Sequence, residues 1–327
     1  LSPRQVLDLW KSLRDNGLQD TLGLLHFHMG SQISNVRDIA NGMREATRYF
    51  VELSKLGATI SHVDVGGGLG IDYEGTRSRS YCSINYGLNQ YASNIVQPLA
   101  EACEEHKLPP PRIVTECGRA MTAHHAVLIA NVSEVEQAPE GRVPPAHDDE
   151  PAVIRHLREI HDELDSRPAV ELFHDAQHHH SEGLSLYALG QMDLTHRARI
   201  DDLFYAIAHA VRGRLSSEER NHRDLLDELN ERLVDKYFVN FSVFESIPDV
   251  WAIDQVFPIL PIERLDEAPQ RRGVIADMTC DSDGMVKTYV ENEGLDSSLP
   301  LHALKHGESY RLGFFLVGAY QEILGDI

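Results

Sequence analysis

The sequence predicts an α/β fold followed by a helical segment and a β-rich domain. Apolar runs of strand length alternate with helical stretches in the first third of the chain, and glycine or polar clusters follow three of these runs. The composition then changes after about Glu136. Alternating strands and helices are typical of a parallel sheet or barrel, whose functional residues lie at the carboxyl ends of the strands.

The first helix is predicted over residues 3–16, with Ser2 as its cap and Pro3 at its first position. Hydrophobic periodicity, with Gly57 as a helix stop, predicts the elements that follow. These are a strand at 22–27, a helix at 37–56, a strand at 63–65, a helix at 91–106 and a strand at 112–115.

Three parts are expected along the chain. Residues 1–137 form the α/β part, 138–236 a helical insertion, and 237–327 a C-terminal β-rich domain. Residues 138–151 are rich in proline and acid, and 152–237 show no strand-like run. From Phe238 onward, short β-like runs alternate with proline and Asp/Gly turns.

Charge and composition exclude several classes of protein. The 51 acidic and 30 basic residues give a net charge of −21, which repels nucleic acid and anionic membranes. The four cysteines form no CxxC pair, which suits a reducing cytoplasm rather than a disulfide framework. Because no apolar run reaches about 18 residues, no membrane span is expected.

The most informative stretch is HVDVGGGLGIDY, from His62 to Tyr73. Val63–Val65 is a buried strand in this interpretation, and Gly66–Gly68 remove every Cβ at its end. Consecutive backbone N–H groups in such a turn form an anion-binding concavity. A phosphate cradle and a tight turn without a ligand fit this stretch equally well.

Two further strand ends carry candidate residues. His28 can lie against a planar ring and Ser31 can bind an anion, although a hydrogen-bonded turn histidine explains His28 as well. Glu116 and Arg119 form either a structural ion pair, the commoner case, or separate contacts to a cationic ring nitrogen and a phosphate.

The C-terminal part offers a third group, in TCDSDG and GAYQ. Cys280 is a candidate proton donor, and Asp281 and Asp283 are candidates for a cationic substrate end. Turn chemistry accounts for the two acids equally. Tyr320 either reaches a phosphate or covers the core.

A histidine group lies in the expected insertion at His174, His178, His179 and His180. Its i, i+4 spacing suits zinc, but no accompanying acid or cysteine makes a convincing third ligand. The metal ligands of the chain are therefore left unassigned.

Taken in order, FHMGSQ, DVGGGLG, ECGRA, TCDSDG and GAYQ resemble the motif set of the fold-type III pyridoxal-phosphate-dependent decarboxylases. The flanking text, including VDVGGGLGIDYEGTRS, WAIDQVFPILP and VGAYQEILGDI, is similar to the bacterial arginine decarboxylase branch of that family. The resemblance implies a TIM-like barrel of the alanine racemase type without its N-terminal strands, a helical insertion and a C-terminal β domain.

The resemblance also implies residue roles. His28 stacks on pyridoxal 5'-phosphate, Glu116 holds the ring nitrogen protonated, and Cys280 of the partner subunit protonates the α-carbon. The implied phosphate residues are Ser31, Gly66, Gly67, Gly68, Gly118, Arg119 and Tyr320. The implied substrate contacts are Val63, Asp64, Val65, Gly66, Gly67, Gly68, Leu69, Gly70, Ile71, Asp72, Tyr73, Asp281 and Asp283.

In function, the resemblance implies decarboxylation of L-arginine to agmatine in polyamine biosynthesis, by a homodimer or larger assembly, with Mg²⁺ as a further cofactor candidate. No lysine has the V-K-x-N context of the family's Schiff-base lysine. We therefore expect a segment of a longer enzyme, inactive alone. A decarboxylase of ornithine, lysine or diaminopimelate, and a non-catalytic regulatory homologue, are the alternatives.

Overall fold

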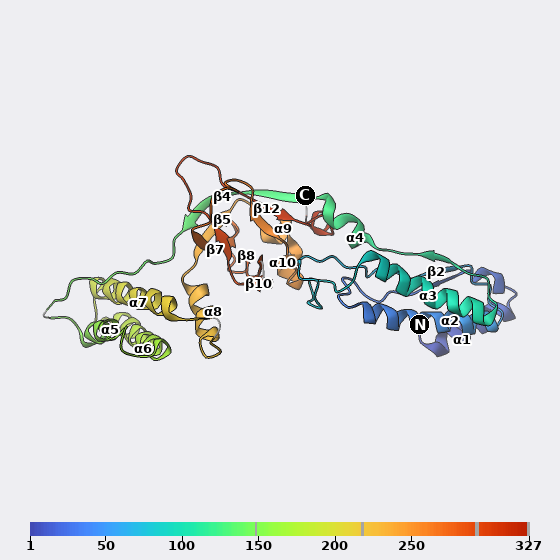
Figure 1. Cartoon of the computed structure of the whole chain (residues 1–327), viewed down its shortest axis with the longest axis horizontal. Coiled ribbons are helices and arrows are strands. Elements are labelled where there is room, and N and C mark those ends of the chain that lie inside the picture. The colour runs from blue at the N-terminus through green and yellow to red at the C-terminus, as the bar shows by residue number, and fades with distance from the viewer. Residues whose placement is uncertain (148, 217–218, 292–293, 326–327) are drawn as a thin grey trace.

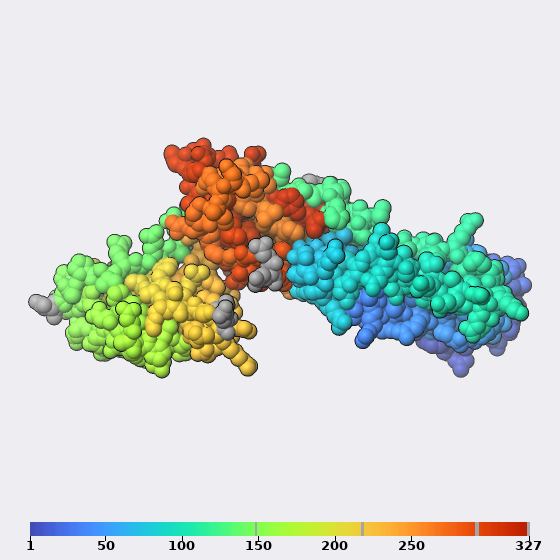
Figure 2. All heavy atoms as spheres, in the orientation of Figure 1, coloured from blue at the N-terminus to red at the C-terminus, as the bar shows by residue number. Residues whose placement is uncertain are grey.

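The computed structural model describes residues 1–147, 149–216, 219–291 and 294–325. Three lobes lie in a row: an α/β lobe at the N-terminal end, a central β lobe and a helical lobe (Figure 1). Figure 2 shows the same three lobes in space-filling form, with the β lobe in the middle. Within the described ranges, no helix is both long and apolar enough to cross a bilayer.

The α/β lobe has a three-stranded parallel sheet in the order β1-β2-β3. Its elements are α1 (Pro3–Asp15), β1 (Leu24–His26), α2 (Val36–Lys55), β2 (His62–Asp64), α3 (Leu88–His106) and β3 (Arg112–Val114), with a 3-10 turn at Gln19–Thr21. The predicted capping by Ser2 is confirmed, because its side chain accepts a hydrogen bond from Gln5 N and Pro3 opens the helix. Gly57, at φ +100°, follows α2 as predicted.

The sheet of this lobe is an arc with one covered face. Ile39, Met43 and Phe50 of α2 pack with Ile95 of α3 and the fully buried Val63 of β2. By contrast, all three side chains of β3 are exposed. Three strands cannot close a barrel, so the arc presents an uncovered inner face.

The helical lobe forms its own core. It contains α5 (Ala152–Asp162), α6 (Ala169–Ala188), α7 (Leu194–Arg214) and α8 (Arg223–Arg232). Leu157, Phe173 and Phe204 are fully buried between these helices. At the edge, the buried Glu150 carboxylate pairs with Arg158 at 2.7 Å and with Arg199 at 3.0 Å. The predicted helical insertion therefore has a separate hydrophobic core.

The central lobe is a seven-stranded, mainly antiparallel sheet in the order β11-β7-β5-β4-β12-β6, with β8 paired to β7. The strands are β4 (Val127–Glu136), β5 (Asp235–Val239), β6 (Ile259–Pro261), β7 (Arg271–Ala276), β8 (Met285–Val286), β11 (Leu299–Leu301) and β12 (Arg311–Phe315). A separate pair is formed by β9 (Tyr289–Glu291) and β10 (Gly294–Asp296). Short helices lie at α4 (Gly118–Thr122), α9 (Val243–Ser246), α10 (Pro248–Ile253) and α11 (Gln321–Leu324), with a 3-10 turn at Ala123–His125.

The sheet pairing differs from the expected first boundary at residue 137. Strand β4 lies before that boundary, yet it pairs with β5 and with β12. The α/β lobe therefore ends before Val127. The local pattern of a strand does not show which distant strand it pairs with, so this assignment required the three-dimensional structure.

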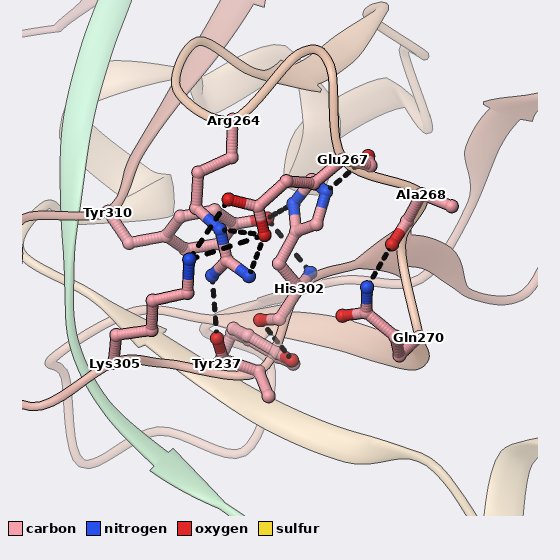
Figure 3. Close-up of polar contacts among 9 residues, drawn as sticks. Tyr237, Arg264, Glu267, Ala268, Gln270, His302, Lys305 and Tyr310 are labelled. Atoms are coloured by element: carbon pink, nitrogen blue, oxygen red, sulfur yellow. Dashed lines mark hydrogen bonds and ion pairs between the residues drawn. The ribbon is translucent and has the colours of Figure 1, made fainter.

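A polar cluster joins two loops of the β lobe (Figure 3). Glu267 accepts hydrogen bonds from Arg264 at 2.6 Å and from Lys305 at 2.9 Å. The ring of His302 contacts the Tyr310 hydroxyl and the Glu267 carbonyl, both at 2.9 Å. Arg264, followed by Lys305, lowers the pKa of the Glu267 carboxyl to about 2. The cluster holds the loop before β7 against the loop before β12.

We predict that Glu267→Gln lowers thermal stability most above pH 4.5. The folded pKa lies near 2 and the ordinary value is 4.5, so the ionised carboxylate stabilises the fold above pH 4.5 and loses this contribution as the pH falls toward 2. Circular dichroism melts between pH 7 and pH 2.5 should show the Tm gap between the two proteins closing in that window. Glu101→Gln on the exposed side of α3 is the control, and a pH-independent gap for Glu267→Gln would contradict the assignment.

Candidate active site

The glycine turn Gly66–Gly68 follows β2 and lies between the ends of β1 and β3. A Cβ on Gly66, whose φ is +65°, would lie 2.5 Å from the Phe27 carbonyl oxygen. A Cβ on Gly67 would lie 2.9 Å from the Glu116 carbonyl oxygen, and one on Gly68 would lie 2.6 Å from Ile33 Cδ1. Backbone following β1 and β3, together with the Ile33 side chain, therefore occupies the space that side chains on these glycines would need.

His28 and Glu116 are held on either side of this turn. The backbone N–H of Gly67 donates to His28 Nδ1 at 3.2 Å, so Nδ1 is the acceptor and the neutral ring carries its proton on Nε2. Glu116 N donates to the Gly66 carbonyl at 2.8 Å. Both side chains are exposed on the inner face of the arc. Their placement leaves a ring face and a carboxylate available to a ligand.

Arg119 is buried, with 7% of its surface exposed, and its guanidinium contacts hydroxyl groups. Its Nε donates to Ser31 Oγ at 3.3 Å, and one terminal nitrogen donates to the Tyr73 hydroxyl at 3.0 Å. The guanidinium carbon lies 5.0 Å from the centre of the Tyr320 ring. In the described part of the chain, no carboxylate forms an ion pair with Arg119, so the alternative of a Glu116–Arg119 pair is not what this structure contains. A buried guanidinium without a carboxylate partner is a fitting site for an anion.

The Tyr73 hydroxyl, which accepts from Arg119, also carries a proton of its own. Burial raises the pKa of Tyr73, with the nearby Arg119 acting in the opposite direction, so the phenol keeps its proton at neutral pH. Because its oxygen already accepts from Arg119, its O–H remains directed elsewhere. Gly118 is adjacent, since a Cβ there would lie 3.7 Å from the Tyr320 hydroxyl.

His26 completes a group that the sequence interpretation missed. Asp64, only 8% exposed, lies 2.9 Å from His26 Nδ1 through one oxygen and accepts from Gly66 N at 3.0 Å through the other. The ligand atoms of His26, Asp64 and Glu116 all lie within 4.8 Å of one another. His26 is the last residue of β1 and His28 lies two residues later; both are exposed whereas Phe27 between them is half-buried, and this alternation could have identified His26.

The other predicted substrate contacts between Val63 and Tyr73 differ in burial and in hydrogen-bond partners. Val63 and Val65 are fully buried, so only their backbone could meet a ligand. Gln32 holds Ile71 by two hydrogen bonds, of 2.6 and 2.9 Å. The buried Tyr86 hydroxyl accepts from Gly70 N at 3.2 Å.

The segment beyond Gly70 then leaves the strand ends. Leu69 bridges to Ile33 just before this point. Asp72 accepts from Ser83 Oγ at 2.7 Å within its own loop. The Tyr73 ring packs edge-on against Phe257 of the β lobe, with centroids 5.6 Å apart. This contact anchors the α/β lobe to the β lobe beside Arg119.

Cys280, Asp281 and Asp283 lie away from this group, on an exposed turn between β7 and β8. Asp281 accepts from Asp283 N at 2.9 Å, and Asp283 accepts from Lys287 at 3.0 Å. Among the described residues, no hydrogen bond or ion pair joins these three to the glycine turn. Within one chain the two acids make the turn contacts that were their alternative interpretation.

Two known domains match this chain. Residues 7–123 match the pyridoxal binding domain of the pyridoxal-dependent decarboxylases, and residues 147–230 match the arginine decarboxylase helical bundle domain. The biosynthetic arginine decarboxylase of Xanthomonas campestris pv. campestris is 89% identical over 100% of this chain and 52% of its own length. This chain belongs to the biosynthetic arginine decarboxylase family. A second family member, from Xylella fastidiosa strain 9a5c, is 79% identical over the same shares.

The fold of the family is also that of this chain. The crystal structure of the biosynthetic arginine decarboxylase from Campylobacter jejuni is 34% identical, with a TM-score of 0.79 over 99% of this chain and 52% of that one. The predicted fold class, a partial β/α barrel with a helical insertion and a C-terminal β domain, is thereby confirmed. The chain spans about half the length of the family members that it matches.

We predict that Gly66→Ala destabilises the α/β lobe more than Gly75→Ala does. The two glycines have similar φ values, +65° and +72°, but only Gly66 would place its Cβ against backbone. Left-handed strain costs about 1 kcal/mol at both sites, and overpacking adds about 1–3 kcal/mol at Gly66. Urea unfolding followed by Trp10 fluorescence in a Trp251→Phe background reports on this lobe. Equal losses at both positions would show that close packing is not the constraint.

Proposed function

We propose that this chain supplies much of the cofactor site and part of the substrate site of an arginine decarboxylase, which converts L-arginine into agmatine and CO2 with pyridoxal 5'-phosphate. The observation that carries the proposal is the buried Arg119 guanidinium, which has hydroxyl partners and no carboxylate partner in the described ranges. It lies beside Ser31, Gly118 and Tyr320. These residues fit a phosphate group.

The cofactor would be held at three places. Arg119, Ser31 and Tyr320 would bind its phosphate together with backbone N–H groups of the glycine turn. His28 would lie against the ring, since its Nδ1 is already fixed by Gly67. The Glu116 carboxylate would face the ring nitrogen and hold a proton there by charge-assisted hydrogen bonding.

Pyridoxal phosphate held by these residues would supply an electron sink for the decarboxylation. The Glu116 carboxylate would favour this by holding the proton, and so the positive charge, on the ring nitrogen. His26 and Asp64 orient the glycine turn, because the Asp64 carboxylate accepts a hydrogen bond from Gly66 N while it pairs with His26. The residues described here therefore bind, orient and hold a proton.

We assign proton delivery to Cys280 of a second subunit, with Asp281 and Asp283 facing the guanidinium of arginine. In the described ranges no hydrogen bond or ion pair joins these residues to Arg119 or the glycine turn, which supports a shared site in a homodimer or larger assembly. Arginine is preferred over ornithine, lysine or diaminopimelate on the strength of the 89% identity over the whole chain. Magnesium is not part of this assignment, and we place the reaction in the cytoplasm.

The first test is agmatine formation by the complete protein, with and without pyridoxal phosphate. Release of CO2 from arginine, ornithine, lysine and diaminopimelate should be compared, and arginine should be decarboxylated fastest. Faster decarboxylation of another basic amino acid would show that this amino acid, and not arginine, is the substrate. Absence of reaction with all four would favour a non-catalytic role.

We predict that Arg119→Gln weakens binding of pyridoxal phosphate to the complete protein by about 10- to 150-fold, equivalent to about 1.5–3 kcal/mol for a hydrogen bond to a charged group. Binding of pyridoxal, which lacks the phosphate, should change little. The matched control is Arg112→Gln, an exposed arginine at the opposite end of β3. Equal weakening of both ligands would mean that Arg119 acts through the fold instead of through the phosphate.

A further inference from the structure

A cluster on the helical lobe contains three imidazoles and one carboxylate. His179 is at its centre: Nδ1 lies 3.1 Å from Glu182 Oε2, and its ring centre lies 4.7 Å from that of His156 and 5.2 Å from that of His178. His156 comes from α5 and the other three from α6. The sequence interpretation found no third ligand here, but Glu182 lies one helical turn beyond His178 and provides it.

The geometry is close to that of a metal site. The ligand atoms of His178, His179 and Glu182 lie within 4.8 Å of one another. Side-chain rotation alone can bring such atoms to about 2.0–2.2 Å from a common ion. His178 and Glu182 are exposed and His179 is partly exposed, so an ion can enter from solvent.

The neighbouring His180 shows what a structural histidine looks like in the same helix. Its Nε2 lies 2.7 Å from Asp201 Oδ1, and its ring stacks on Phe204 with centroids 4.2 Å apart. Burial lowers the pKa of this ring. His180 is therefore committed to the contact between α6 and α7, whereas His178 and His179 point to the other side of the helix.

We propose that His156, His178, His179 and Glu182 bind a zinc-class divalent cation that ties α5 to α6. Imidazole nitrogens with one carboxylate select Zn²⁺, Ni²⁺ or Cu²⁺, whereas Mg²⁺ prefers an all-oxygen site. Among the described residues, the other group with metal-ligand spacing is His26, Asp64 and Glu116, which belongs to the candidate active site. The helical cluster lies in a different lobe with its own core.

The test is isothermal titration of the 327-residue chain with Zn²⁺ alone, in a His26→Asn background that disables the group beside the glycine turn. We expect one Zn²⁺ per chain, weakened at least 10-fold by His179→Gln and by His178→Gln. His156→Asn should also weaken it, because α5 contributes that ligand. His161→Gln, at the end of α5 and outside the cluster, is the matched control and should leave the affinity unchanged.

Substitution of Co²⁺ for Zn²⁺ gives a second readout. The visible absorption of a Co²⁺ ion in a nitrogen-rich, four-coordinate site should appear in the parent protein and be absent from His179→Gln. Far-ultraviolet circular dichroism verifies that each variant remains folded. The proposal would be overturned if the three cluster variants kept both the heat of Zn²⁺ binding and the visible absorption of Co²⁺. It would also be overturned if the parent protein did not bind Zn²⁺ at micromolar concentration. Titration with Mg²⁺ should give no comparable binding.

Discussion

The ends of three parallel strands meet at Gly66–Gly68, where only a chain without side chains leaves enough room. The Phe27 carbonyl at the end of β1 and the Glu116 carbonyl after β3 approach this turn so closely that a Cβ on Gly66 or Gly67 would collide with backbone. This contact fixes the spacing of the strand ends. His28, Glu116 and Arg119 follow those ends directly, so their mutual position depends on the same turn.

The site also depends on the buried charge of Arg119. Placing a guanidinium in the interior is costly unless its donors are matched, and here hydroxyls of Ser31 and Tyr73 match two of them without neutralising its charge. The Tyr73 ring is itself held by Phe257 in the β lobe. The packing between lobes thus holds Tyr73, and with it the buried positive charge of Arg119, in place.

Local rules predicted much of the fold. Residues 3–16, 37–56 and 91–106 matched α1, α2 and α3 closely because amphipathic periodicity and the Ser2 cap are local signals. The pairing of β4 with β12 was not predictable, since strand partners distant in sequence leave no local mark. The glycine turn and Arg119 could be singled out from the sequence because each follows a strand.

The partners of those site residues could not be found in the same way. The position of Asp64 between His26 and Gly66 depends on two strands coming into register, His26 with Asp64. Similarly, the sequence favoured an ion pair between Glu116 and Arg119, which are three residues apart. The turn after β3 instead directs Glu116 to the glycine side and Arg119 to the hydroxyls of Ser31 and Tyr73.

The helical lobe is inserted between two strands that are direct neighbours. Strand β4 ends at Glu136 and β5 begins at Asp235, and Glu136 pairs with Lys236 in the antiparallel ladder. The whole lobe is thus the loop of an oversized β-hairpin. Closing so long a loop in an unfolded chain costs entropy, and the helices of the lobe, which pack on local contacts, shorten the effective separation of its two ends. The β4–β5 ladder thus pairs on either side of a separately packed unit, with one register shift in β4 between Val132 and Glu134.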